Sequence, residues 1–292
     1  MKKILIIMLS CFMISINMYP VLAQQDEYLC EKGEIHLNEF DITIANDNIS
    51  TIKPKVKKLN NNLDKLLEFC KNKEYKDSII KSIKNKEDVS IGYSTVYLKE
   101  VKDNNGIHYE PIKMNELQVM PYSSSGDISK YSLTFNLTVT SSETSTKRTV
   151  NTSTYIFWNP TIAFSGEGRV ANGSDDFMTI SYSKPYKISI NKTTGGMSGI
   201  AADKPYLHDI SDYAAVAAFR ENNGGGYMKA NSTQSIQSKK SRRFVAKYVH
   251  TWAKVSPTFS LGVNSEGLGT VGISFSPSAS AWQISTYVDH SC

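Results

Sequence analysis

Cysteine is scarce in this sequence, and the short motifs of the common catalytic centres are missing from it. Four of the 292 residues are cysteine, and no Cys-x-x-Cys pair occurs. The sequence also lacks His-Glu-x-x-His, Gly-x-Ser-x-Gly, a Walker phosphate loop and a dinucleotide-binding fingerprint. The sequence therefore lacks the usual signatures of zinc proteases, α/β-hydrolases and nucleotide-dependent enzymes. We therefore expect a protein without catalytic residues, without a bound metal and without a cofactor.

Long hydrophobic runs are equally rare, and the one that occurs stands at the N-terminus. Met1-Lys2-Lys3 precedes an apolar stretch that ends in Val21-Leu22-Ala23. A basic start, a short apolar run and small residues before a cleavage point are the parts of a secretory signal. The sequence predicts that a signal peptide, residues 1–23, is removed and that the mature chain is secreted. Asn17 and Pro20 disfavour the alternative, a retained membrane anchor.

The net charge of the mature chain is small but unevenly distributed. Residues 24–292 contain 31 basic and 28 acidic residues, which gives +3. A charge of this size does not indicate a nucleic-acid partner, and secretion argues against one independently. Eleven lysines and only four acids lie between Lys53 and Lys86.

The same basic segment has the periodicity of helices. Apolar side chains recur at spacings of three and four residues: Val56, Leu59, Leu63, Leu66, Leu67, Cys70, Tyr75, Ile79 and Ile83. This pattern predicts two helices, or one helix broken near residues 71–73, with most lysines on the opposite face. That face could meet anionic lipid or an anionic cell-wall polymer, or it could simply be solvated. The solvated face is the favoured interpretation, because lysine is common on exposed helix surfaces.

Three cysteines remain after cleavage of the signal, which leaves at least one thiol without a partner in the same chain. They are Cys30, Cys70 and Cys292. A disulfide between Cys30 and Cys292 would tie the two ends of the chain together, although it is one of three possible pairings. Cys70 lies on the apolar face of a predicted helix, which is typical of a buried thiol.

Beyond Asp88 the pattern changes to that of strands. Leu133, Phe135, Leu137 and Val139 alternate with polar residues, which indicates a half-buried strand. Further strands are expected at 90–99, 107–120, 149–158, 177–182, 186–190, 216–219, 244–252, 258–263, 270–275 and 282–288. The predicted fold is mainly β, an antiparallel sandwich or barrel-like sheet formed by residues 89–292, with a small helical segment at residues 24–88.

Residues 129–158 are the segment with the most specific alternative interpretation. Fourteen of the 26 residues from 129 to 154 are Ser or Thr, and one face of the first strand is apolar. A hairpin with one apolar face and one hydroxyl-rich face is what a β-pore-forming toxin inserts into a membrane, and toxins of the aerolysin type carry such hairpins. A surface hairpin of an antiparallel sheet has the same composition and is the favoured interpretation, because half-polar alternation is the rule in such sheets.

Two small clusters are candidate sites. His208, Asp209 and Asp212 would be the catalytic group if the protein were a hydrolase, although such a trio in a turn is more often a surface polar group. Tyr248, His250 and Trp252 share one face of a predicted strand. A core edge with one hydrogen-bonded histidine is the favoured interpretation of this face. If the protein binds a ligand, we expect these three residues to form an exposed aromatic strip that contacts it.

The C-terminal quarter resembles a group of secreted proteins. The stretches Tyr248–Trp252, Ser256–Val263, Gly272–Ser278 and Ala281–Gln283 are similar to the C-terminal part of uncharacterised secreted proteins of Gram-positive bacteria. The resemblance implies a secreted β-rich protein, and it implies no activity and no catalytic residues. The functional prediction is therefore a secreted, non-catalytic protein that binds an extracellular or cell-surface ligand, with membrane contact expected only if the pore-forming alternative holds.

Overall fold

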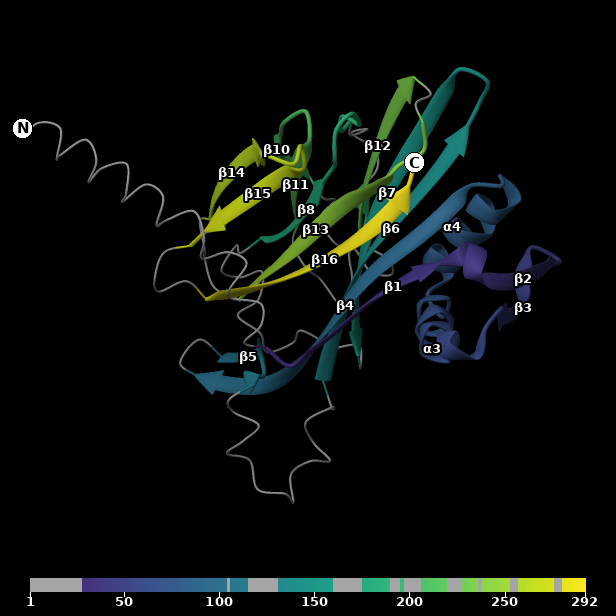
Figure 1. The fold of residues 1–292 in the computed structure, drawn as a ribbon. Coiled ribbons are helices and arrows are strands. Elements are labelled where there is room, and N and C mark those ends of the chain that lie inside the picture. Colours follow the sequence, from purple (N-terminus) through teal and green to yellow (C-terminus); the bar gives the residue numbers. More distant parts are fainter. Residues whose placement is uncertain are drawn as a thin grey trace, which may run out of the picture.

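The structure is a computed structural model, and the residues that it describes form a layered β fold (Figure 1). They are 28–103, 106–114, 131–159, 175–189, 195–196, 206–219, 227–235, 238–252, 257–275 and 280–292. The predicted signal peptide, residues 1–23, lies outside the described residues. All the strand pairs are antiparallel, and neither of the two main sheets closes on itself within the described part of the chain. The prediction of a mainly β, sandwich-like fold with a small N-terminal helical part is confirmed.

The larger sheet has seven strands in the order β1-β4-β6-β7-β12-β9, with β5 paired to β4. Its strands are β1 (Cys30–His36), β4 (Asp88–Asp103), β5 (Gly106–Pro111), β6 (Tyr131–Glu143), β7 (Lys147–Asn159), β9 (Gly195–Gly196) and β12 (Tyr227–Ser235). Since β1 pairs with β4 from Cys30 to His36, the predicted N-terminal segment contributes a strand to the main sheet as well as helices.

The smaller sheet has five strands in the order β10-β11-β8-β13-β16, and it packs on one face of the larger sheet. Its strands are β8 (Asp176–Ser181), β10 (Tyr206–Ile210), β11 (Ala214–Phe219), β13 (Ser241–Thr251) and β16 (Ala281–Ser291). The four apolar residues of the alternating strand β6 face this interface, where Phe135 lies 6.0 Å from Tyr248 between ring centroids. The alternation in the sequence therefore correctly identifies the face of β6 that lies in the core.

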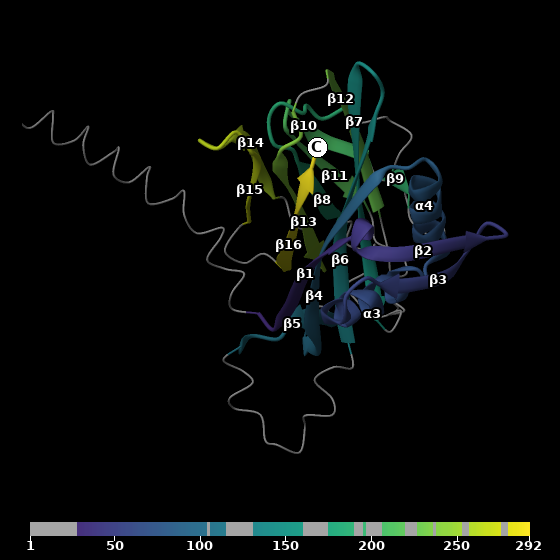
Figure 2. The same cartoon turned by 45° about the vertical axis from the view of Figure 1, so that its right-hand side comes forward.

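Each sheet has a further layer on its outer face (Figure 2). The hairpin of β14 (Thr258–Val263) and β15 (Gly269–Ser274) packs on the smaller sheet through Val271 and Ile273. On the larger sheet lie η1 (Leu37–Glu39), β2 (Phe40–Ala45), β3 (Asn48–Pro54), η2 (Lys57–Leu59), α3 (Asn60–Phe69) and α4 (Lys73–Lys84). The turn between β2 and β3 has positive φ at Asn46 and Asp47, which suits a two-residue hairpin turn.

The break between α3 and α4 lies where the sequence predicts it. The prediction of two helices with a break near residues 71–73 is confirmed by α3 and α4. The Asn72 side chain accepts a hydrogen bond of 2.9 Å from the Tyr75 backbone N–H, which caps the first turn of α4. Phe69 and Tyr75 point to the sheet, where their rings lie 5.7 Å from Phe157 and 4.9 Å from Tyr155 between centroids. These aromatic contacts fix both helices on the larger sheet.

The Ser/Thr-rich hairpin is the centre of the larger sheet. Its strands β6 and β7 pair with each other, and they are also paired on their outer edges, β6 with β4 and β7 with β12. The hydroxyl-rich face is largely covered: Thr138 is buried and lies within hydrogen-bond distance of the Tyr75 hydroxyl, at 3.0 Å. The two strands of this hairpin are therefore part of the body of the protein and not a separate tongue on its surface, and residues 143–147 at its tip are exposed.

Two glycines leave room for atoms of a neighbouring strand, one between the two sheets and one within the larger sheet. A Cβ atom on Gly92 of β4 would lie 1.9 Å from the Tyr287 carbonyl oxygen of β16. At Gly33 of β1 the space of a side chain is occupied by the Tyr93 ring, whose hydroxyl would lie 2.5 Å from such a Cβ. In both places the absence of a side chain sets the contact between neighbouring strands.

The strand predictions differ from the structure in a few places. Residues 186–189 do not form a strand, and residue 190 lies outside the described residues. Ile188 donates a backbone hydrogen bond of 2.7 Å to the Asp212 carbonyl. The strand expected at 107–120 ends at Pro111, and residues 115–120 lie outside the described residues. Strands β1 and β12 were not expected, because their sequences are polar and lack a clear alternation.

Candidate functional site

Tyr248, His250 and Trp252 lie in the core, and the expectation that they form an exposed strip is wrong. Their exposed fractions are 0%, 2% and 8%. The three side chains do share one face, but β13 turns that face toward the larger sheet. The physical reason is that β13 is an inner strand of its sheet and that large aromatic side chains gain most from burial.

The buried strip forms a hydrogen-bonded cluster around one carboxylate. Asp176 Oδ2 accepts a bond of 2.6 Å from the Tyr248 hydroxyl and lies 3.2 Å from His250 Nδ1. Its second oxygen, Oδ1, accepts a bond of 2.8 Å from the Thr251 backbone N–H. Asp176 is itself buried, so this cluster joins β8 to β13 and satisfies polar groups that water cannot reach.

All three tryptophans of the chain gather at the same end of the sandwich. Trp158 and Trp282 each lie 5.3 Å from the His250 ring, and Trp252 stacks on His108 at 4.6 Å, between ring centroids. The Trp282 indole N–H donates to the Tyr109 carbonyl at 2.9 Å. The rings fill the space between the sheets, so this aromatic cluster is a structural core and leaves no surface for a ligand among the described residues.

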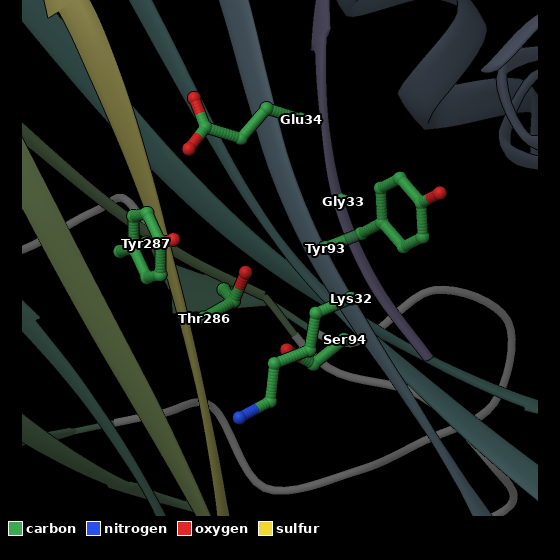
Figure 3. A pocket seen from close by; sticks show the side chains of 7 residues that line it. All are labelled: Lys32, Gly33, Glu34, Tyr93, Ser94, Thr286 and Tyr287. Atoms are coloured by element: carbon green, nitrogen blue, oxygen red, sulfur yellow. The ribbon is translucent and has the colours of Figure 1, made fainter. Parts of the chain in front are cut away.

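A shallow groove lies between β1 and β16, where the two sheets meet at their edges (Figure 3). It has a volume of about 160 Å³ and is lined by Lys32, Gly33, Glu34, Tyr93, Ser94, Thr286 and Tyr287. Figure 3 shows Lys32 and Glu34 extending from β1 toward β16, whereas the Tyr93 ring points the opposite way. The groove therefore combines a cation, a carboxylate and an aromatic ring on rigid strands.

Tyr287 is the aromatic wall of this groove and is 44% exposed. The Arg243 guanidinium lies 4.4 Å from the Tyr287 ring centroid. Arg243 is held in place by two bonds to the Asp289 carboxylate, of 3.0 and 2.8 Å. An exposed tyrosine whose orientation is fixed by a stacked arginine loses little conformational freedom when it binds a ligand.

A chain of hydrogen-bonding groups runs from the groove into the interior. His36 Nδ1 lies 2.9 Å from Ser90 Oγ, which lies 2.8 Å from His290 Nδ1, and His290 Nε2 lies 2.8 Å from Ser141 Oγ. At the groove end, Glu34 lies 3.7 Å from His36 Nε2. The chain joins β1, β4, β6 and β16, so that both sheets share it.

The burial of His290 makes the stability of the protein depend on pH. The pKa of His290 is lowered to about 4: burial is the main cause, Asp88 opposes the shift, and the neighbouring His36, Lys239 and Arg148 add to it. An ordinary histidine in the unfolded chain titrates near 6.5. The unfolded chain therefore binds more protons between these two values, and the free energy of unfolding falls as pH falls from about 6.5 to about 4.

Because of His290, we expect the free energy of unfolding to be about 3 kcal/mol lower at pH 4 than at pH 7. The measurement is urea unfolding at a series of pH values. In the His290→Asn variant the free energy of unfolding should depend less on pH between about 6.5 and about 4. The loss of stability at still lower pH, where carboxylates become protonated, should remain. Equal pH profiles for the two proteins would contradict the assignment.

The three cysteines are free in the structure, so the expected Cys30–Cys292 disulfide is wrong. Cys30 lies beside Gln283 and Ile284 at the start of β16, whereas Cys292 follows the end of that strand. Nine residues of extended strand separate Gln283 from Cys292, roughly 30 Å, while a disulfide requires Cα atoms within about 7 Å. Burial raises the pKa of both Cys70 and Cys292 to about 11, which keeps these thiols protonated and unreactive.

Among the described residues, the acids that the hydrolase alternative requires do not form a site. Asp209 is exposed and accepts a bond from the neighbouring Ile210 N–H, at 2.8 Å. Asp212 is also exposed and pairs with Lys187 at 2.6 Å. The His208 side chain lies outside the described residues. Within the described ranges, no group of three potential metal ligands occurs.

A comparison with family models and with curated proteins found no match for this chain. The geometry of the groove and of the surfaces around it is therefore the basis for a function.

Proposed function

We propose that this is a secreted, non-catalytic protein that binds an extracellular or cell-surface ligand through the groove between β1 and β16. The observation that carries the proposal is Tyr287, an exposed aromatic ring fixed by Arg243 beside Lys32 and Glu34. Tyrosine and arginine are the residue types that most often dominate binding surfaces, because they offer apolar area and hydrogen bonds together.

The roles of the buried acids and histidines support binding rather than catalysis. Asp176 and His250 are occupied by bonds within the core, and His290 is held between two serine hydroxyls. A catalytic acid or base must come within hydrogen-bond reach of its substrate. These three groups are each at most 2% exposed, which leaves no such approach in the folded state.

The pore-forming alternative has less support from the position of the hairpin. Release of β6 and β7 would break the ladders to β4 and β12, which pair over eleven and nine residue positions. The face that would meet lipid also carries Thr152, Thr154 and the buried Arg148. An arginine on the lipid face of a barrel costs about 2–4 kcal/mol near the bilayer midplane.

The Tyr287→Ala variant tests the proposed binding surface. We expect it to bind roughly 10- to 30-fold more weakly than the wild-type protein, the usual loss when a central aromatic contact is removed. The probes are an array of immobilised glycans together with fixed bacterial and animal cells, and the readout is the concentration at half-maximal binding.

Val263→Ala is the matched control, because Val263 has a similar exposed fraction but lies on β14, in the layer outside the smaller sheet. It should bind as the wild type does. The proposal is wrong if the wild-type protein binds none of these probes, or if Tyr287→Ala binds as tightly as Val263→Ala.

A further inference from the structure

The positive charge of the protein is concentrated in one segment of the outer helical layer. Residues 53–86, called here the basic segment, contain eleven lysines and four acids, a net charge of +7. Residues 24–292 together carry only +3, so the remainder of that chain carries −4. The basic segment comprises the end of β3, η2, α3 and α4, which Figure 2 shows together on one side of the larger sheet.

Most lysines of the basic segment point to solvent and are not neutralised. The exposed lysines are Lys53, Lys55, Lys57, Lys58, Lys71, Lys73, Lys81, Lys84 and Lys86. Within the described ranges, Lys84 alone among these nine pairs with an acid, Asp47. The acids Asp64, Glu74 and Asp77 are exposed on the same segment, so its outer surface keeps a clear positive excess.

Two large apolar side chains stand among these lysines. Leu67 of α3 is 45% exposed and Val56, just before η2, is 47% exposed. The buried face of α3 is already complete, because Leu66 and Phe69 pack on the sheet. Leu67 lies on the flank of this buried face, and the exposed Lys71 follows just after the end of α3. Exposed apolar residues amid lysines are typical of a helix that rests on a membrane surface.

The helices are too short to cross a bilayer. With 10 and 12 residues, α3 and α4 are about 15 and 18 Å long, against a hydrocarbon core of about 30 Å. No helix among the described residues is long and apolar enough to span a membrane. The aromatic contacts of Phe69 and Tyr75 hold both helices flat on the sheet, so their outer face is available without unfolding.

We propose that the basic segment binds the surface of an anionic lipid membrane, with its lysines at the head groups and Leu67 and Val56 entering the interface. An anionic cell-wall polymer would satisfy the lysines but would give the two apolar side chains no favourable environment, so the lipid surface fits better. This surface comprises different residues from the groove at Tyr287, and the inference does not depend on the function proposed for that groove.

The test is a vesicle co-sedimentation assay with full-length mature protein. Vesicles of phosphatidylcholine mixed with phosphatidylglycerol should bind the wild type, and vesicles of phosphatidylcholine alone should not. A triple variant, Lys57→Gln, Lys58→Gln and Lys73→Gln, should bind the anionic vesicles roughly 100-fold more weakly, since each lysine near such a surface contributes about 1 kcal/mol. Added salt should weaken the binding of the wild type.

The matched control carries the same change of net charge at exposed lysines outside the basic segment: Lys113→Gln, Lys147→Gln and Lys240→Gln. It should bind the anionic vesicles within a few-fold of the wild type. Equal losses in the two triple variants would mean that net charge alone acts, and they would overturn the proposal.

A second variant distinguishes the lipid surface from an anionic polymer. Leu67→Ser should weaken binding to anionic vesicles and leave binding to soluble poly(glycerol phosphate) unchanged. If Leu67→Ser binds the vesicles as the wild type does, or if only the polymer binds, the membrane assignment is wrong. Circular dichroism of every variant should match the wild type, since all these side chains are exposed.

Discussion

Replacing Gly92 by alanine should lower the free energy of unfolding by at least about 3 kcal/mol, or prevent folding. The new methyl group would lie 1.9 Å from the Tyr287 carbonyl oxygen and 3.1 Å from the Val288 side chain. Both contacts belong to β16, and the closer one is to main chain, so a rotamer change cannot relieve it. The smaller sheet would have to move away from β4 along its edge. Urea unfolding measures the loss.

Gly262→Ala is the control for this prediction. Gly262 also lies within a strand, β14, but an added methyl group would meet only the Thr270 hydroxyl, at 3.3 Å. That side chain can rotate, so the variant should stay within about 1 kcal/mol of the wild type. A Gly92→Ala protein as stable as Gly262→Ala would show that β4 and β16 are not in the close contact described above.

The second large effect is expected at Asp176. The Asp176→Ala variant should lose about 3–5 kcal/mol, because it leaves the Tyr248 hydroxyl, the Thr251 N–H and His250 buried without the carboxylate they share. The measurement is again the free energy of unfolding in urea. Loss of near-ultraviolet circular dichroism should accompany it, since the surrounding tryptophans pack against His250.

Asp176→Asn separates the shape of this side chain from its charge. The amide oxygen can still accept from the Thr251 N–H, and the side-chain volume is nearly unchanged. This variant should lose about 1–2 kcal/mol, clearly less than Asp176→Ala. If alanine costs less than about 1 kcal/mol, the cluster does not hold β8 and β13 together as its geometry implies.

The parts of the fold with strong periodicity were predictable from the sequence. The alternation from Leu133 to Val139 gave the correct inward face of β6, and the spacing of three and four gave α3 and α4 with their break at Asn72. The order of the strands was not predictable, because pairing of β1 with β4 or of β8 with β13 depends on contacts between residues far apart in the chain.

The site was predicted less well than the fold, for a physical reason. Shared faces follow from the period of a strand, so Tyr248, His250 and Trp252 were correctly placed together. Whether that face meets water or a second sheet depends on tertiary packing, which the strand period does not contain. The groove at Tyr287 joins residues from both ends of the chain, and no local motif marks it.

The position of β16 has a consequence for when the protein can fold. The last eleven residues of the chain before Cys292 form this strand, which pairs with β13 and also contacts the face of β4. A polypeptide made from its N-terminus onward therefore lacks one wall of its central core until β16 has been synthesised. Until then the apolar side chains of β4 and β6 that face β16 have no partner from that strand.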